Sequence, residues 1–308
     1  MKKKTPSHLE ASVKQRLLNL SVEKGDDFYL ILTRYVLERF LYRIGKSRYK
    51  SQLILKGAML FPIWMGTSHR PTRDLDFLGF GDDSPDRLIN LFQEICRMEV
   101  EPDGLLFDEN DIRVEDIRAD QEYQGKRILI IGYLGKAKST LQIDIGFGDI
   151  VTPEAQETQY PTLLDFPPPI ILIYSKETFI SEKLQAMIFF GMVNSRMKDY
   201  YDIWIISRRF PFQGNLLALA INRTFNRRST EIPKDIPSSL TEMFADDKGK
   251  RTQWKAFLKR NRLAESETEL SKVVSDLRDF IMPVFSSIVE RVSFPHTWDP
   301  GGPWSDKG

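Results

Sequence analysis

The sequence of 308 residues has little of what several common kinds of functional site require. It contains one cysteine, Cys96, and three histidines, which lie far apart at positions 8, 69 and 296. One cysteine cannot form an internal disulfide, and so few cysteines and histidines argue against a zinc site. No apolar run approaches the roughly 18 residues of a membrane-spanning helix, and polar residues follow the basic N-terminus where a signal peptide would be apolar. These absences predict a cytoplasmic protein without a membrane segment.

The charges are balanced in total but unevenly distributed. The chain has 44 Lys and Arg against 43 Asp and Glu, a formal net charge of +1. Residues 71–124 carry 16 acidic and 5 basic side chains, whereas residues 204–262 carry 13 basic and 5 acidic ones. An acidic cluster is able to hold divalent cations and a basic segment to bind phosphates. Two ordinary solvated surfaces are the alternative explanation.

Apolar periodicity predicts a mixed N-terminal part and a helical C-terminal part. Strands are expected near 53–56, 74–78, 112–117, 127–134, 140–147 and 170–174, where apolar residues alternate with polar ones or form short buried runs. Helices are expected over 10–22, 26–44, 58–65 and 85–98, with Gly45 as a C-cap, and over most of 176–292. We therefore predict a mixed α/β (α+β) part over 1–170, a helical domain over 171–293 and a mobile tail over 294–308.

Two aspartates on one predicted strand are the most informative feature. Asp74 and Asp76 are two positions apart, so their side chains point to the same face of the strand. Two like charges held together disfavour each other, and Mg²⁺, which prefers carboxylate oxygens, would relieve that repulsion. Asp144, on the predicted strand 140–147, would complete a two-metal site. Gly57, at the end of the strand that contains Lys56, permits close approach of the backbone to a ligand. The alternative is a solvated strand face.

A second set of charged residues lies on the predicted helices. Lys183 is flanked by apolar core positions, and a lysine at such a boundary suits nucleotide phosphates. Asp199 and Asp202 lie three positions apart on one helical face and can anchor a basic side chain. The alternative for Lys183 is a lysine that extends along the surface. The alternative for Asp199 and Asp202 is a purely structural ion pair.

Together these residues resemble the AbiEii/AbiGii family of nucleotidyltransferase-like toxins, which is related to the MenT toxins. The resemblance covers roughly 53–206 and depends on four motifs: Leu55-Lys56-Gly57, Arg70-x-Thr72-x-Asp74-x-Asp76, Glu182-Lys183-x-x-Ala186 and Arg196-x-Lys198-Asp199-x-x-Asp202. It implies a DNA-polymerase-beta-type nucleotidyltransferase core.

The resemblance also implies a role for each matching residue. Lys56, Gly57, Ala58 and Thr72 would lie at the nucleotide, and Thr72 occupies a hydroxyl position that some members phosphorylate. Asp74 and Asp76 would bind metal, Lys183 would contact the triphosphate, and Asp199 would complete the catalytic set. Ala58 departs from the usual Gly-Ser or Gly-Gly turn, so one side-chain contact to phosphate is missing.

The resulting functional prediction is Mg²⁺-dependent transfer of a nucleotide from a nucleoside triphosphate to RNA, with tRNA 3′ ends as the expected acceptor. The protein would be the toxin of a type IV toxin–antitoxin pair, with a cognate antitoxin as partner and the basic segment as the RNA-binding surface. A catalytically weak module that binds a nucleotide or a partner is one alternative. A structural interaction protein with solvated charges is the other.

Overall fold

A computed structural model describes residues 7–66, 70–117, 125–263 and 268–306. The chain forms two compact units, one of residues 1–149 with 155–174 and the other of 150–154 with 175–308. The predicted boundary at 170/171 lies four residues before the observed one. Residues 150–154 join the second unit because the Thr152 amide donates to the Thr178 hydroxyl at 2.7 Å, and the Thr152 carbonyl accepts from Ser175 and Thr178.

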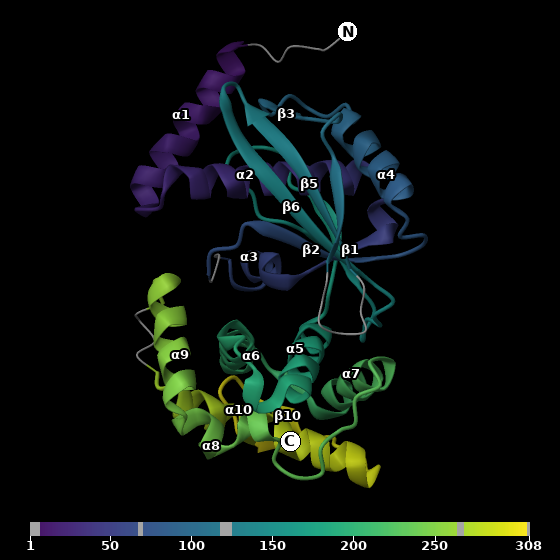
Figure 1. The fold of residues 1–308 in the computed structure, drawn as a ribbon, viewed down its shortest axis with the longest axis vertical. Coiled ribbons are helices and arrows are strands. Elements are labelled where there is room, and N and C mark those ends of the chain that lie inside the picture. Colours follow the sequence, from purple (N-terminus) through teal and green to yellow (C-terminus); the bar gives the residue numbers. More distant parts are fainter. Residues whose placement is uncertain (1–6, 67–69, 118–124, 264–267, 307–308) are drawn as a thin grey trace. The chain divides into compact units, whose positions relative to one another are not determined.

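The first unit is built on an eight-stranded mixed sheet, counted over the described residues (Figure 1). Its strands are β1 (Leu53–Lys56), β2 (Asp74–Gly79), β3 (Leu105–Phe107), β4 (Arg113–Ile117), β5 (Gly125–Leu134), β6 (Ala137–Phe147), β7 (Gln156–Gln159) and β8 (Ile170–Ile173). The order is β3-β5-β6-β2-β1-β8-β7, and β4 pairs with β5 beside β3. β2, the strand that contains Asp74 and Asp76, runs parallel to β6 and antiparallel to β1, so it is paired on both sides. Strands β3 and β7 were not predicted from the sequence.

Among its described residues the first unit also contains four helices. They are α1 (Ser7–Lys24), α2 (Phe28–Lys46), α3 (Phe61–Met65) and α4 (Pro85–Arg97), with short 3-10 turns at η1 (Lys50–Gln52) and η2 (Gly57–Leu60). α2 contacts β6 and β8 and crosses the sheet in Figure 1. Phe40 of α2 stacks with Phe92 of α4 and packs edge-on to Phe107, so these three rings join both helices to the sheet. The strand faces that carry Asp76 and Asp144 point away from α2 because alternate residues point to opposite faces.

Gly45 has a different role from the predicted one. The helix continues through Gly45 to Lys46, and Ser47 is the C-cap, so the predicted end of this helix is wrong. A side chain at position 45 would place its Cβ 2.5 Å from the carbonyl oxygen of Ile170. The glycine therefore lets α2 pack closely against the beginning of β8.

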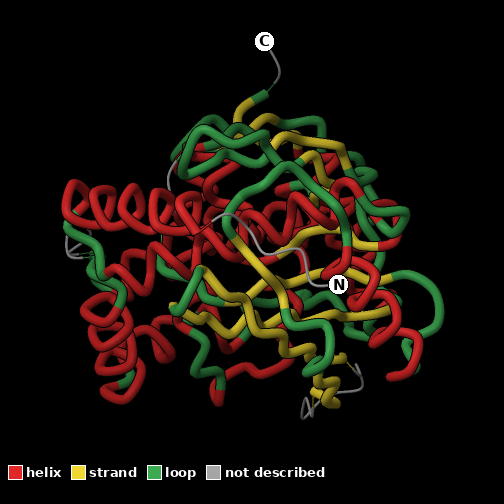
Figure 2. The backbone as a smooth tube through the Cα atoms, turned by 90° about the horizontal axis from the view of Figure 1, so that it is seen from above, coloured by secondary structure: helices red, strands yellow, loops and turns green. Residues whose placement is uncertain are grey.

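Helices, drawn red in Figure 2, make up most of the second unit. The unit contains α5 (Lys176–Phe190), η3 (Gly191–Val193), α6 (Met197–Arg209), β9 (Phe212–Gln213), α7 (Gly214–Arg227), η4 (Ser238–Leu240), α8 (Glu242–Asp246), α9 (Lys248–Arg260), α10 (Leu270–Glu290), β10 (Thr297–Trp298) and β11 (Trp304–Ser305). α10 packs against α6, α7 and α8, and the Ser175 hydroxyl caps the N-terminus of α5. No helix among the described residues is long and apolar enough to cross a membrane.

The described residues of the C-terminal segment, 294–306, do not form the mobile tail that the sequence predicts. β10 pairs with both β9 and β11 in a small antiparallel sheet. The indole of Trp298 is buried and donates to the Ser207 carbonyl at 2.7 Å, and that of Trp304 donates to the Phe280 carbonyl at 2.9 Å. Burial of the Trp298 indole and the hydrogen bonds of both indoles outweigh the Pro- and Gly-rich composition that favoured a mobile segment.

Candidate active site

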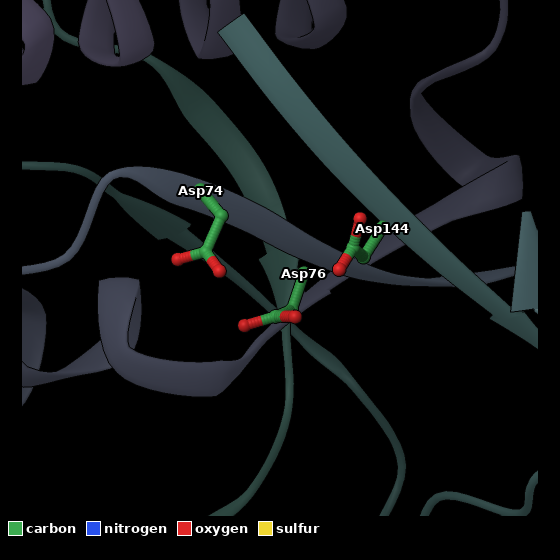
Figure 3. Close-up of side chains that lie close together, drawn as sticks. All are labelled: Asp74, Asp76 and Asp144. Carbon is green, nitrogen blue, oxygen red and sulfur yellow. The ribbon is translucent and has the colours of Figure 1, made fainter. Parts of the chain in front are cut away.

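Three carboxylates meet on the face of the sheet away from α2. Asp74 and Asp76 project from β2, and Asp144 lies on β6 as the direct partner of Asp76 in the parallel ladder. One oxygen of each carboxylate lies within 4.8 Å of one oxygen of each of the others (Figure 3). All three side chains are partly buried. The sequence-predicted trio is thus brought together, because period-two alternation and the β2–β6 register place all three on one face.

Gly57 makes room for one of these carboxylates. It follows β1 with a φ of +73°, and an ideal Cβ at this position would lie 2.0 Å from Oδ2 of Asp76. Lys56 pairs directly with Asp76 across the antiparallel β1–β2 ladder, so the turn after β1 passes the carboxylate. The glycine is therefore required both by the backbone conformation and by the approach of Asp76.

Charged residues form a row across four strands at the level of Asp76. Lys56 on β1, Asp76 on β2, Asp144 on β6 and Arg127 on β5 are successive direct partners. The Arg127 guanidinium donates two hydrogen bonds of 2.8 Å to the two oxygens of Asp144, on the side away from Asp76. Gln142 adds a longer contact of 3.3 Å to each oxygen. The hydrogen bond to Asp144 raises the pKa of Arg127, so the guanidinium remains charged.

Two further predicted residues lie beside the carboxylates. The Thr72 hydroxyl is buried and donates to Oδ1 of Asp74 at 2.6 Å, which fixes that carboxylate. The ammonium of Lys56 lies 3.6 Å from Asp149 and 5.5 Å from the centre of the Tyr174 ring. Ala58 is buried in the turn after Gly57. The nucleotide-binding roles expected of Lys56, Gly57, Ala58 and Thr72 remain predictions.

The carboxylate cluster fits a divalent cation. Hard cations such as Mg²⁺ are held by one or two carboxylates and keep waters for phosphate oxygens. Asp74 and Asp76 offer such oxygens from a rigid strand, and the space that Gly57 leaves open accommodates the Asp76 carboxylate. Asp144 shares both its oxygens with Arg127, but each oxygen has a second lone pair, and Arg127 approaches from the β5 side. The donor set suits Mg²⁺ or Mn²⁺ better than zinc, which prefers nitrogen and sulfur ligands.

A second charged cluster lies in the other unit. Lys183 on α5 donates to Asp199 at 2.7 Å and lies 2.9 Å from Asp202, both on α6. Both aspartates are fully buried, and Arg196 contacts the second oxygen of Asp199 at 2.7 Å. Burial alone would raise the pKa of Asp199, but Lys183 and Arg196 outweigh it and lower that pKa. The structure therefore brings Lys183, Asp199 and Asp202 together as an ion-pair cluster; their catalytic roles remain predictions.

Parts of the basic segment are structural. Arg228 hydrogen-bonds to Gln185 at 3.0 Å and lies 3.4 Å from Glu182. Lys250 is buried and donates to the carbonyl of Asn194 at 2.8 Å. These side chains are used within the second unit, so the basic segment does not act as one surface. Other basic side chains of this segment, on α9, are exposed.

Sequence reasoning missed Arg127. Its signal was present in the hairpin that joins β5 and β6, where Leu134 pairs with Ala137 across a two-residue turn. A two-residue turn fixes the register of the whole hairpin, and pairing outward from it reaches Arg127 opposite Asp144. Gly135, with a φ of +59°, supplies the conformation that such a turn requires.

Comparison with known proteins supplies a family. A family model described as "Nucleotidyl transferase AbiEii toxin, Type IV TA system" matches residues 39–290. The solved structure of the nucleotidyltransferase toxin MenT4 from Mycobacterium tuberculosis H37Rv covers 92% of this chain and 99% of its own, at 15% identity and a TM-score of 0.51. That of JHP933 from Helicobacter pylori covers 82% and 90%, at 16% identity and a TM-score of 0.48. No curated protein sequence matches. The likeness to MenT4 shows a shared fold.

Proposed function

The chain belongs to the AbiEii family of nucleotidyl transferase toxins of type IV toxin–antitoxin systems, and from that premise we propose that it transfers a nucleotide from a nucleoside triphosphate to RNA. The family membership predicted from the four motifs is confirmed, and with it the class of enzyme, a nucleotidyltransferase. We further propose that the reaction requires Mg²⁺ and that the acceptor is the 3′ end of a tRNA. The observation that carries the proposal is the cluster of three carboxylates on β2 and β6.

Each charged or polar residue around the carboxylate cluster of the first unit has a proposed role. Asp74 and Asp76 would hold the metal, with Asp74 oriented by the Thr72 hydroxyl and Asp76 seated against the Gly57 turn. Asp144 would supply a third carboxylate, whose orientation Arg127 fixes. Bound Mg²⁺ would supply charge neutralisation at the reacting phosphate. Lys56, on the same face of the sheet, would add positive charge close to the nucleotide.

Lys183 is proposed as the ligand of the triphosphate, with Asp199 as the second catalytic residue of that unit. Two buried carboxylates keep the ammonium charged and hold its position, so Lys183 would bind phosphate as a fixed point charge. Asp199 would act chiefly through Lys183 and Arg196, because its two oxygens accept from those side chains. The family name also implies a cognate antitoxin as partner.

The proposed reaction is tested by nucleotide incorporation. Purified protein is incubated with each labelled nucleoside triphosphate and total tRNA, with Mg²⁺ or with a chelator. The wild type and Asp86→Asn, which removes an exposed carboxylate from the first turn of α4, are expected to label RNA only with the metal. Asp76→Asn should reduce labelling by orders of magnitude.

Labelling that persists in the chelator or in Asp76→Asn would contradict the proposal. If the wild type binds nucleotide but labels no RNA with any of the four triphosphates, the catalytically weak binding module becomes the better description.

A further inference from the structure

One face of α9 carries only basic side chains. Lys248, Arg251, Lys255 and Lys259 follow one another at intervals of three or four residues, the spacing that aligns side chains along a helix. All four are exposed, whereas Trp254 and Lys250 on another side of the helix are buried in the second unit. With a rise of about 1.5 Å per residue, the four charges extend over about 16 Å. We refer to these four residues as the basic face of α9.

Within the described part of the chain no ion pair neutralises this face, and the nearest acidic residue in sequence is Asp247, the N-cap of α9. α9 contains no acidic residue, and no described carboxylate forms an ion pair with any of the four. Arg251 and Lys255, and Lys255 and Lys259, are like-charged pairs four residues apart, an arrangement that disfavours a helix. Lys248 adds a positive charge to the N-terminal turn, where the helix dipole also disfavours it. A polyanion bound along this face would relieve each of these repulsions.

The chemistry of the face favours the backbone of a nucleic-acid duplex. Proteins that hold unpaired bases use exposed aromatic side chains as stacking platforms. The two aromatic residues of α9 do not serve here, because Trp254 is buried and donates its indole N–H to Thr268, and Phe257 packs against Tyr201 and Trp254. A protein partner would be expected to meet apolar or aromatic residues at the centre of its interface, and the four basic side chains supply none. Regularly spaced cations match phosphates, the main contacts in recognition of double-stranded RNA.

We propose that the basic face of α9 binds the sugar–phosphate backbone of a helical stem of the acceptor RNA. The inference rests on the proposed function for the identity of the nucleic acid as RNA. It assigns to α9 the role first predicted for the whole basic segment, and it removes Arg228 and Lys250 from that role because they are used internally. Binding through this face is expected to be independent of base sequence and strongly dependent on salt.

The test measures RNA binding in a chelator, so that it does not depend on metal or on nucleotide transfer. The probes are a stem-loop RNA with a single-stranded 3′ extension and that extension alone. The variant carries Arg251→Gln, Lys255→Gln and Lys259→Gln. The control carries Lys14→Gln, Lys136→Gln and Lys138→Gln, which removes the same charge from exposed positions of the first unit.

The wild type and the control are expected to bind the stem-loop more tightly than the extension alone. The α9 variant should bind the stem-loop about tenfold more weakly, or worse, at low salt. The slope of log affinity against log salt should fall by about 0.7–0.9 for each phosphate that the variant no longer neutralises. Unchanged melting temperatures of the α9 variant, with and without nucleotide, would show that the fold is retained.

Three results would overturn the inference. The first is wild-type affinity and salt dependence in the α9 variant, and the second is an equal weakening in the control. The third is equal binding of the extension alone and the stem-loop, which would place unpaired nucleotides on this face. Stem binding that depends on α9 in a protein that transfers no nucleotide would count against the proposed function and leave this inference standing.

Discussion

The contact between Gly57 and Asp76 gives a prediction with an internal control. Gly57→Ala adds a methyl group where the ideal Cβ lies 2.0 Å from Oδ2 of Asp76, so the carboxylate must move by more than an ångström. Gly66 has the same φ of +73° but no neighbouring atom within 4 Å of its ideal Cβ. Gly66→Ala therefore reports the backbone strain alone, and Gly57→Ala reports the same strain together with the displacement of Asp76.

The magnitudes follow from these two effects. A non-glycine residue in the left-handed region costs about 1–2 kcal/mol, and overpacking a close contact adds about 1–3 kcal/mol. We expect Gly66→Ala to lower the free energy of unfolding by the first amount and Gly57→Ala by both. The assay is urea unfolding of metal-free protein.

A double variant tests whether Asp76 causes the difference in unfolding free energy between the two glycine substitutions. In an Asp76→Ala background the carboxylate is gone and only the Cβ of residue 76, 2.9 Å from the ideal Cβ at position 57, remains, so Gly57→Ala should cost less than in the wild type but still more than Gly66→Ala does. Gly57→Ala should also abolish metal-dependent stabilisation, whereas Gly66→Ala should keep it. If Gly57→Ala costs no more than Gly66→Ala in the wild-type background, the proposed packing of Asp76 against the turn is refuted.

Three other substitutions test the charged contacts. Arg127→Met should lower the free energy of unfolding of metal-free protein by about 1–2 kcal/mol. Arg113→Met removes an exposed pair of hydrogen bonds to Asp111 and should cost much less, because exposed ion pairs contribute little to stability; equal costs in urea unfolding would contradict this. Lys183→Met should cost about 3–5 kcal/mol because Asp202 and one oxygen of Asp199 lose the buried ammonium that they share, and adding Asp202→Asn should restore part of the melting temperature; an unchanged melting temperature would refute the pairing. Burial raises the pKa of Glu38 to about 7, so ionisation of Glu38 lowers the stability of the wild type as the pH rises from about 4.5 to 7. The free energy of unfolding of Glu38→Gln should therefore rise by about 1–3 kcal/mol relative to that of the wild type between pH 5 and pH 8. A difference that does not change with pH would contradict this.

Much of the first unit could be predicted from the sequence because its strands have a clear period. The alternation in 140–147 and the Asp-x-Asp pattern on β2 were sufficient to place Asp74, Asp76 and Asp144 on one face. The partner of Asp144 could not be found in this way, because Arg127 becomes its neighbour only through the hairpin register. Periodicity describes which face a residue points to, whereas register decides what it contacts.

The helical unit was less predictable in detail. Lys183 was expected at a boundary where its ammonium would face nucleotide phosphates, yet that ammonium pairs with two fully buried aspartates. Two-residue strands such as β10 and β11 are too short for any periodic signal, so the packing of Trp298 and Trp304 was missed. In the first unit, likewise, Gly45 looked like a helix stop because the residue that requires a glycine there, Ile170, is 125 positions away in the sequence.

The central claim is that Asp74, Asp76 and Asp144 hold a divalent metal for nucleotide transfer. The most direct measurement is the melting temperature of wild type and Asp76→Asn, each without additions and with Mg²⁺ plus a nucleoside triphosphate. We predict that metal and nucleotide together raise the melting temperature of the wild type but not of Asp76→Asn. The metal-free variant should be at least as stable as the wild type, because one of the repelling charges is gone. A variant that melts below the wild type without metal, yet keeps the full metal-dependent rise, would contradict the account.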